Sequence, residues 1–223
     1  MEIKIVRQIM EWNEKCDDEI QKLLNEKGIF MINVMGSPGG GKTSFIIKLI
    51  EKLRDKYRVG VIEADIAGKL DAVTIGLMGI PVVQLNTEGA CHIEAMSIKK
   101  ILPEFNLDTL DILIIENIGN LVCPAEFEIG EHLKIALLSI PEGDDKVEKY
   151  PLMFTKADAL ILSKYDLKEY FNFDERRVEA RGKEVNPNLQ IFNANSITGE
   201  GIDNFVHWLE REMDRRKVKA KEE

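Results

Sequence analysis

The sequence predicts an α/β fold in which a mostly parallel β-sheet is flanked by helices on both faces. Short apolar runs alternate along the chain with longer segments whose apolar residues recur at helical spacing, which is typical of strand–helix–strand units. One of these runs leads directly into a glycine-rich turn, and an amphipathic segment follows the turn. Because ligands bind at the carboxyl ends of the strands in such sheets, we expect a functional site there.

The first predicted element is a helix over residues 2–27. Its apolar side chains, including Trp12 and Cys16, recur every three or four residues, and Gly28 follows as a suitable helix end. This spacing puts Cys16 on the apolar stripe of the helix, so we expect it to pack in the core.

Seven strands and five further helices complete the pattern. The strands are predicted at residues 29–35, 58–63, 81–85, 110–115, 133–140, 159–163 and 189–193. The helices are predicted at residues 43–56, 69–78, 91–102, 174–184 and 200–219. The pattern divides the chain into three parts. Residues 1–28 form an N-terminal helix that packs on the domain, residues 29–213 form a single domain, and residues 214–223 form a charged tail that frays into solvent.

Composition narrows the class of protein. The 223 residues carry a formal net charge of −9, which argues against nucleic acid or an anionic membrane as the main partner. No apolar run approaches the ~18 residues of a membrane span, and the charged N-terminus lacks a signal-peptide core, so we expect a cytoplasmic protein. Three cysteines, an odd number, do not suggest a disulfide framework.

The glycine-rich turn has the pattern G-x-x-x-x-G-K-[ST] of a phosphate-binding loop between a strand and a helix. Its glycines let backbone N–H groups wrap a phosphate, and the following helix directs its positive end at the same anion. The lysine is expected to reach the outer phosphates, and the threonine hydroxyl to bind Mg²⁺. The nucleotide-binding residues predicted here are Gly36, Ser37, Gly39, Gly40, Gly41, Lys42, Thr43 and Ser44.

Two other predicted strands end in carboxylates. Glu116 closes an apolar strand as in a Walker B element, whose acid holds Mg²⁺ through its water shell. Asp65 closes another strand and is expected to touch the waters of the metal or to orient the attacking water. We therefore predict Thr43 as a direct Mg²⁺ ligand, with Asp65 and Glu116 acting mainly through water. Glu63 and Asp71 are interpreted as solvated or capping residues.

A strand at 159–163 is followed by a sequence close to the Asn-Lys-x-Asp motif of guanine-specific nucleotidases. Asp166 is expected to accept hydrogen bonds from the guanine N1–H and exocyclic amine, a pattern that adenine does not offer. The aliphatic stem of Lys164 is expected to pack over the base. Ser163 stands where asparagine is usual, which we expect to loosen the loop without removing the discriminating acid.

A second segment, residues 192–201, resembles the fifth motif of the same guanine-binding enzymes. It follows the last predicted strand, so it too is placed at the carboxyl edge of the sheet. A backbone N–H group from Ser196 or Ile197 is expected to meet the guanine oxygen.

Cys91-His92 and Cys123-Pro124 carry side chains that are suitable ligands for Zn²⁺ or Ni²⁺. Their separation is too long for a zinc finger, and three ligands make an incomplete set, which a second subunit would complete across a two-fold axis. From the residues alone, two half-buried cysteines beside an unrelated histidine remain an alternative. The two other histidines are interpreted as packed or solvated.

Together these segments resemble the HypB family of hydrogenase maturation GTPases, over nearly the whole chain after the first helix. The most specific stretch is 116–124, supported by 85–92 and 142–151. The family belongs to the dimeric P-loop GTPases of the signal-recognition-particle and MinD type, the SIMIBI class. The sibling UreG family presents a Cys-Pro-His triplet, whereas this chain has Cys-His and Cys-Pro apart, which favours the hydrogenase branch.

The resemblance implies a GTP-hydrolysing metallochaperone that assists nickel insertion into [NiFe]-hydrogenase. It implies GTP or GDP with Mg²⁺, and Ni²⁺ or Zn²⁺ held by Cys91, His92 and Cys123 at the interface of a homodimer that nucleotide and metal promote. The implied partners are a nickel-delivery protein and the hydrogenase large-subunit precursor. The alternatives are a UreG-like nickel-delivery GTPase, a metal carrier with a mainly structural nucleotide site, and an ATPase of the MinD type.

The predicted catalytic residues are Lys42, Asp65 and Glu116, which position the nucleotide and stabilise charge. The sequence shows no obvious catalytic glutamine or arginine finger, so we expect slow intrinsic hydrolysis. The loop from Glu116 to Cys123 joins the Mg²⁺ side to a metal ligand, and we hypothesise that loss of the γ-phosphate shifts this loop. Residues 142–151 either contact the nucleotide or a second subunit, or form a polar surface loop.

Overall fold

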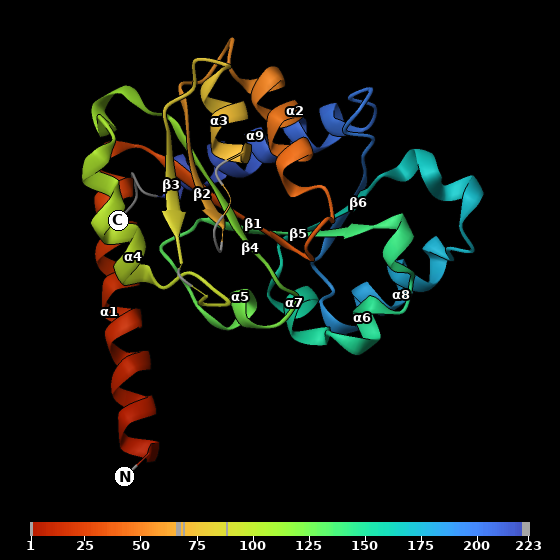
Figure 1. The fold of residues 1–223 in the computed structure, drawn as a ribbon, viewed down its shortest axis with the longest axis horizontal. Helices are drawn as coiled ribbons and strands as arrows, with labels where there is room; N and C mark the ends of the chain where they lie inside the picture. Colours follow the sequence, from red (N-terminus) through yellow and green to blue (C-terminus); the bar gives the residue numbers. More distant parts are fainter. Residues whose placement is uncertain (1, 66–67, 69, 88, 220–223) are drawn as a thin grey trace.

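A parallel sheet lies at the centre of the computed structural model, which describes residues 2–65, 68, 70–87 and 89–219 (Figure 1). Within these residues seven strands pair in the order β3-β2-β4-β1-β5-β6-β7, and all six pairings are parallel. The strands are β1 (Phe30–Gly36), β2 (Val59–Asp65), β3 (Val82–Asn86), β4 (Ile112–Gly119), β5 (Leu133–Ser139), β6 (Ala159–Ser163) and β7 (Gln190–Asn193). The predicted fold class and all seven predicted strands are confirmed.

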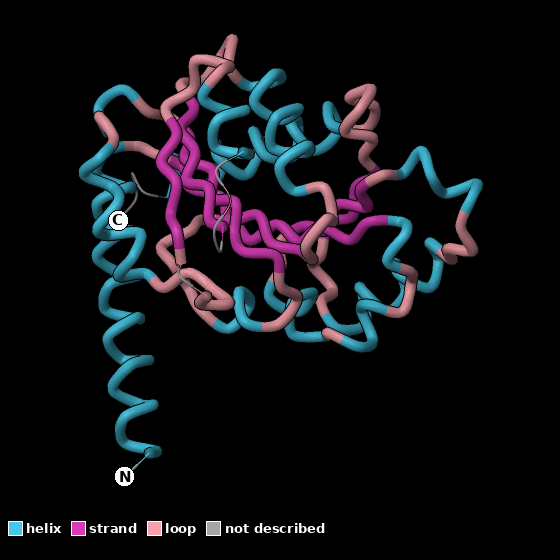
Figure 2. Tube along the Cα trace, in the orientation of Figure 1, coloured by secondary structure: helices cyan, strands magenta, loops and turns pink. Residues whose placement is uncertain are grey.

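The helices connect the parallel strands and cover both faces of the sheet (Figure 2). They are α1 (Glu2–Lys27), α2 (Lys42–Leu53), α3 (Leu70–Gly76), α4 (Ala95–Ile101), α5 (Cys123–Glu126), α6 (Lys146–Lys149), α7 (Pro151–Lys156), α8 (Glu175–Val185) and α9 (Ile202–Lys219). Short 3₁₀ helices are η1 (Leu102–Glu104), η2 (Leu107–Thr109), η3 (Ile140–Glu142) and η4 (Tyr165–Tyr170).

Three details of the helices differ from the prediction. The helix expected at 91–102 begins only at Ala95, because the chain before it is extended through Glu94. Helix α9 ends at Lys219, as predicted for the helix at 200–219, so the first part of the tail expected to fray over 214–223 is helical, and residues 220–223 lie outside the described residues. Helices α5, α6 and α7 are too short to show helical periodicity in the sequence.

The five inner strands bury both of their faces, which explains why they are continuous apolar runs in the sequence, whereas the edge strands β3 and β7 are only partly buried. On one face, alternate residues such as Ile32 and Val34 of β1 pack against α2, α3 and α9. On the other face, Met31 packs with α1 and α4, whereas Met35 packs with α5 to α8. The carboxyl ends of the strands are left for the loops that carry the predicted site residues.

Helix α1 lies along α4 and the loop that precedes β5. Cys16 is buried with Ile20 and Leu24, as predicted, whereas Trp12 is 66% exposed and does not belong to the buried stripe. The Asn13 side chain accepts a hydrogen bond from the Ala95 N–H (2.9 Å) and donates one to the Glu128 carbonyl (2.7 Å). Among the described residues, no helix combines the length and apolarity needed to cross a bilayer.

His132 gives the fold a pH dependence that can be measured. Its buried ring stacks on Phe30 (4.9 Å between centroids), and its Nδ1 accepts the Met31 N–H (2.9 Å), while Nε2 faces Asn25 Oδ1 (3.1 Å). Burial lowers the pKa of His132 to about 4. The unfolded chain, in which a histidine titrates near 6.5, therefore binds more protons between these values.

We therefore expect this histidine to lower the free energy of unfolding by about 2 kcal/mol between pH 7 and pH 5. Burial raises the pKa of Asp17 to about 6, which acts in the opposite direction, so the comparison must be between variants. Urea unfolding should be measured at pH 7 and pH 5 for the wild type and for His132→Gln. The free energy of unfolding should fall less between these pH values in the variant, by about the contribution of His132. An equally steep decline in the variant would contradict the assignment.

Candidate nucleotide and metal sites

The glycine-rich loop joins β1 to α2 and lines a cavity of about 470 Å³. Gly41, directly before α2, has φ 92°, a conformation that glycine adopts without strain. A Cβ on Gly36 would lie 2.8 Å from the Leu137 carbonyl oxygen, so this position also requires glycine. The other lining residues that matter for chemistry are Lys42, Thr43, Ser44, Glu63, Asp65, Asp71, Glu116 and Lys164.

Lys42 is buried at the base of this cavity. Its Nζ donates to the carbonyl oxygens of Gly36 (3.3 Å) and Ser37 (3.1 Å). Burial lowers the pKa of Lys42, and nearby carboxylates, led by Glu116 and Glu142, oppose that shift. The ammonium group thus lies in the phosphate loop, where an anionic ligand would stabilise its charge.

Thr43 and Glu116 lie together on the other side of the cavity, as a shared Mg²⁺ site requires. Thr43 Oγ1 is 2.8 Å from Glu116 Oε1 and 3.0 Å from Asp71 Oδ2. Glu116 is 4% exposed, and burial raises its pKa to about 7. Its Oε2 is buried without a hydrogen-bond partner among the described residues. A hard divalent cation with oxygen ligands fits these donors.

The interpretation of Glu63 as a solvated or capping residue is wrong. Glu63 is 3% exposed, its Oε2 also lacks a hydrogen-bond partner in the described part of the chain, and burial raises its pKa to about 8. It pairs in register with Glu116 on the neighbouring strand, so the two carboxylates lie on one face of the sheet. Strand order, which the sequence did not reveal, is the signal that would have found it.

The loop after β6 is fastened to the phosphate loop. Ser163 is 1% exposed and its Oγ donates to the Gly40 carbonyl (2.6 Å), so the expectation that this serine loosens the loop is not met. Lys164 has φ 53°, and its Nζ donates to the Gly39 carbonyl (2.7 Å). Asp166 follows in η4 and is exposed.

The loop after β7 lies beside it, because the Tyr165 N–H donates to the Ala194 carbonyl (3.2 Å). The Ile197 N–H donates to the Asn195 side chain (2.9 Å), so this group is already engaged. Ser196 has a buried Oγ that lacks a partner among the described residues. Of the two predicted contacts to guanine, the Ser196 N–H is therefore the better candidate.

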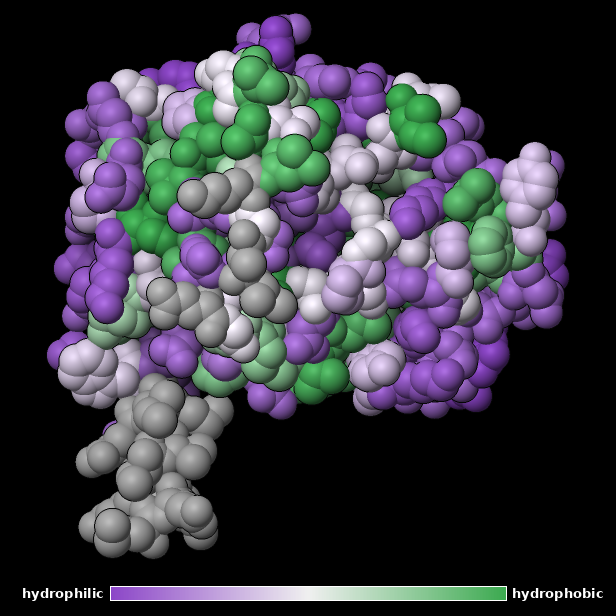
Figure 3. All heavy atoms as spheres, in the orientation of Figure 1, coloured by the Kyte–Doolittle hydropathy of each residue, from purple (hydrophilic) through white to green (hydrophobic). Residues whose placement is uncertain are grey.

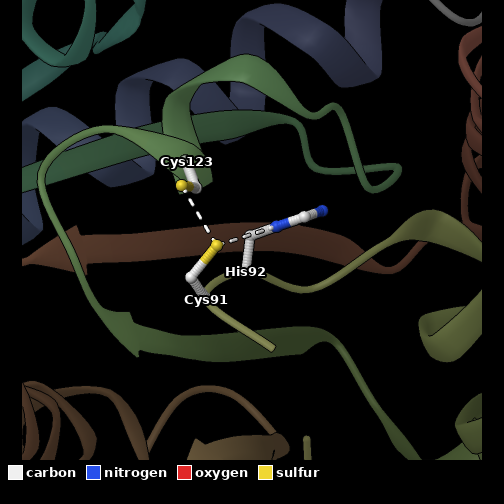
Figure 4. A group of neighbouring side chains, drawn as sticks. All are labelled: Cys91, His92 and Cys123. Atoms are coloured by element: carbon white, nitrogen blue, oxygen red, sulfur yellow. Dashed lines mark hydrogen bonds between the residues drawn. The ribbon is translucent and has the colours of Figure 1, made fainter. Parts of the chain in front are cut away.

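The structure brings Cys91, His92 and Cys123 together, although 32 residues separate the two cysteines (Figure 4). Their potential ligand atoms lie within 4.8 Å of one another. Cys91 Sγ is 3.1 Å from Cys123 Sγ and 3.6 Å from His92 Nδ1. Both cysteines are free thiols. Two thiolates this close would repel each other, and a soft divalent cation removes that repulsion.

The His92 ring is held on two further sides. It stacks on Phe127, with 3.9 Å between ring centroids and 14° between planes. Its Nε2 is buried and lies 3.8 Å from the Glu94 carboxylate. The Nδ1 edge therefore faces the cysteines, which is the orientation that a metal ligand at this position requires.

Comparisons with known proteins identify the family of the chain. The model of the CobW/HypB/UreG nucleotide-binding domain matches residues 30–193. A probable hydrogenase maturation factor HypB from Methanocaldococcus jannaschii is 37% identical over 211 residues, which cover 95% of this chain and 96% of that protein. The hydrogenase maturation factor HypB of Escherichia coli is 43% identical over 180 residues, or 81% of this chain and 62% of that protein.

Solved structures give the same result. HypB from Helicobacter pylori in complex with nickel matches with a TM-score of 0.87 at 36% identity, covering 92% of this chain and 96% of that one. HypB from Archaeoglobus fulgidus matches with a TM-score of 0.85 at 32% identity, covering 91% and 99%. The parallel sheet and its phosphate loop define a P-loop nucleotide-binding protein. The chain belongs to the CobW/HypB/UreG family, in which it groups with the HypB hydrogenase maturation factors.

Proposed function

We propose that this protein is a GTP-hydrolysing metallochaperone that assists nickel insertion into [NiFe]-hydrogenase in the cytoplasm. One observation carries the proposal: strand β4 holds Glu116 at the nucleotide cavity and leads, seven residues later, to Cys123 of the metal cluster. The same strand thus connects a phosphate site with a site for a soft transition metal. The relative from Helicobacter pylori whose structure contains nickel supports nickel as the cargo.

In this proposal the chain's own residues position the triphosphate. Lys42 and the N–H groups of residues 39–43 neutralise the outer phosphates, and Ser37 and Ser44 flank them. Thr43 would hold Mg²⁺ directly, and Asp65 and Glu116 would act through its waters; the ion would supply positive charge that stabilises the phosphates. The buried, unpartnered oxygens of Glu63 and Glu116 support a cation here. Because the sequence shows no obvious catalytic glutamine or arginine finger, we expect slow intrinsic hydrolysis.

A second copy of the chain completes the assembly that we propose. Three ligand atoms leave a tetrahedral ion one short, and a two-fold axis near the cluster would supply the rest. Leu70 and Val73 of α3 and Leu77 directly after it are exposed. The same helix carries Asp71, which lines the nucleotide cavity, and Figure 3 shows apolar side chains gathered over this part of the surface. An apolar patch of this kind supports a nucleotide-promoted homodimer. A nickel-delivery protein and the hydrogenase large-subunit precursor are the proposed further partners.

Delivery of nickel to urease is the second candidate, because one relative is named a hydrogenase/urease maturation factor. That protein, HypB of Helicobacter hepaticus, is 37% identical over 213 residues, which cover 94% of this chain and 87% of that one. Coexpression with apo-hydrogenase precursor and, separately, with apo-urease distinguishes the two functions. Nickel incorporation only into urease would contradict the hydrogenase assignment.

Base specificity offers a direct test of the nucleotide proposal. We expect Asp166→Asn to lose GTP affinity by about 100-fold and to gain affinity for xanthosine triphosphate, because the amide then matches the xanthine edge. Competition of labelled GTP by GTP, ATP and xanthosine triphosphate measures this change. The exposed neighbour Glu169 provides the control, and Glu169→Gln should retain guanine preference. Equal competition by ATP in the wild type would instead indicate an ATPase.

A further inference from the structure

Asn120 follows β4 directly, between the nucleotide cavity and the metal cluster. Its backbone N–H donates to the Gly36 carbonyl (3.0 Å), and the two residues form an isolated antiparallel bridge. The preceding Gly119 lies so close to the phosphate loop that an added Cβ would be 2.8 Å from Pro38 Cα. The backbone of residues 119–120 is therefore packed against the start of the phosphate loop.

Whereas the backbone of Asn120 contacts the phosphate loop, its side chain contacts the two segments that carry Cys91 and Cys123. Its Oδ1 accepts the N–H of Val122, the residue before Cys123 (2.8 Å), and its Nδ2 donates to the Cys91 carbonyl (3.4 Å). Asparagine fits this position because one side chain provides both a donor and an acceptor.

We propose that Asn120 is a positioning residue that transmits the state of the phosphate loop to the Cys91–Cys123 metal cluster. Its backbone moves with Gly36, and its side chain fixes the relative position of the two cysteine-bearing segments. A displacement of the loop between nucleotide states is thereby converted into a change in the spacing of two metal ligands. This inference rests on the proposed function, since it requires that nucleotide state and metal affinity are coupled.

Asn120→Ala tests the inference because it removes both side-chain links but keeps the backbone bond to Gly36. We would measure the Ni²⁺ dissociation constant of the wild type and the variant with GDP and with a non-hydrolysable GTP analogue. The expected result is that the ratio of the two constants falls at least about threefold toward one in the variant. GTP affinity and melting temperature should match those of the control Asn188→Ala, which lies in the loop before β7. An unchanged ratio in Asn120→Ala would overturn the inference.

Two further outcomes are decisive. If the two Ni²⁺ dissociation constants of the wild type are equal, both the coupling and the role of Asn120 are refuted. If they differ in the wild type and their ratio is the same in the variant, only the role of Asn120 is refuted. If Asn120→Ala does not fold, Asn120→Asp decides, because it keeps the acceptor for Val122 and loses the donor to Cys91. That variant must also show a lowered ratio, and a wild-type ratio would count against the proposal.

Discussion

Lys42→Ala should lower kcat/KM for GTP hydrolysis by at least about 100-fold, the loss typical of removing a preorganised charge from a phosphoryl-transfer site. The ammonium group is buried in the phosphate loop, where water screens its charge poorly. Removing it also removes a positive charge that interacts with the carboxylates of Glu116, Asp71 and Asp65. Steady-state phosphate release and calorimetric GTP binding measure both consequences.

The control for this experiment is Lys48→Ala, on the same helix α2. Lys48 pairs with Glu51 on the surface, so its loss should leave turnover within about twofold of the wild type. Circular dichroism would establish that both variants are folded. Wild-type turnover in Lys42→Ala would show that the loop does not hold the reacting phosphates. If metal delivery nevertheless persisted while hydrolysis was lost, the carrier interpretation with a structural nucleotide site would be favoured.

Cys91→Ser is the second substitution with a large expected effect. It removes Cys91 Sγ, which of the three clustered ligand atoms lies nearest to the other two. The affinity for Ni²⁺ and Zn²⁺ should therefore fall by about 100-fold or more. Competition with a chromophoric chelator measures the affinity, and thiolate-to-nickel absorption bands should disappear. Cys123→Ser should have the same effect, because the ligands act as a unit.

Cys16→Ala is the matched control, because Cys16 is the other free cysteine and is buried on the core-facing side of α1. We expect it to retain full metal affinity while the free energy of unfolding falls by about 1 kcal/mol. Unchanged nickel affinity in Cys91→Ser would exclude the cluster as the metal site. Light scattering on the same samples, with and without GTP and metal, would test whether the cluster also contributes to dimer formation.

Local patterns in the sequence were sufficient to predict most of the fold and part of the site. Buried parallel strands are short apolar runs, so all seven were predictable, and the phosphate loop has a fixed pattern of glycines before Lys42. The joining of Cys91 and Cys123 was not predictable from spacing, since it depends on which strands are neighbours. It followed from the resemblance to a family, and the structure then placed the sulfur atoms side by side.

Other features depend on contacts that no local pattern encodes. From the sequence alone Glu63 is only an acidic residue near the end of a strand, and its place beside Glu116 follows from the register of the two strands. The hydrogen bonds of Ser163 and Asn120 to the phosphate loop join segments far apart in the chain. Trp12 fits the helical period but projects beyond the surface that α1 covers. In each case tertiary neighbours, rather than the residue type, determine the outcome.

The central claim is that nucleotide state controls metal affinity, and titration of Ni²⁺ into the GDP form and into the form with a non-hydrolysable GTP analogue tests it most directly. The account predicts dissociation constants that differ by about 10-fold, within the usual range for coupled sites, and a reciprocal effect of nickel on nucleotide affinity of the same size. Identical nickel affinities in both forms, with nucleotide and metal each bound, would contradict it.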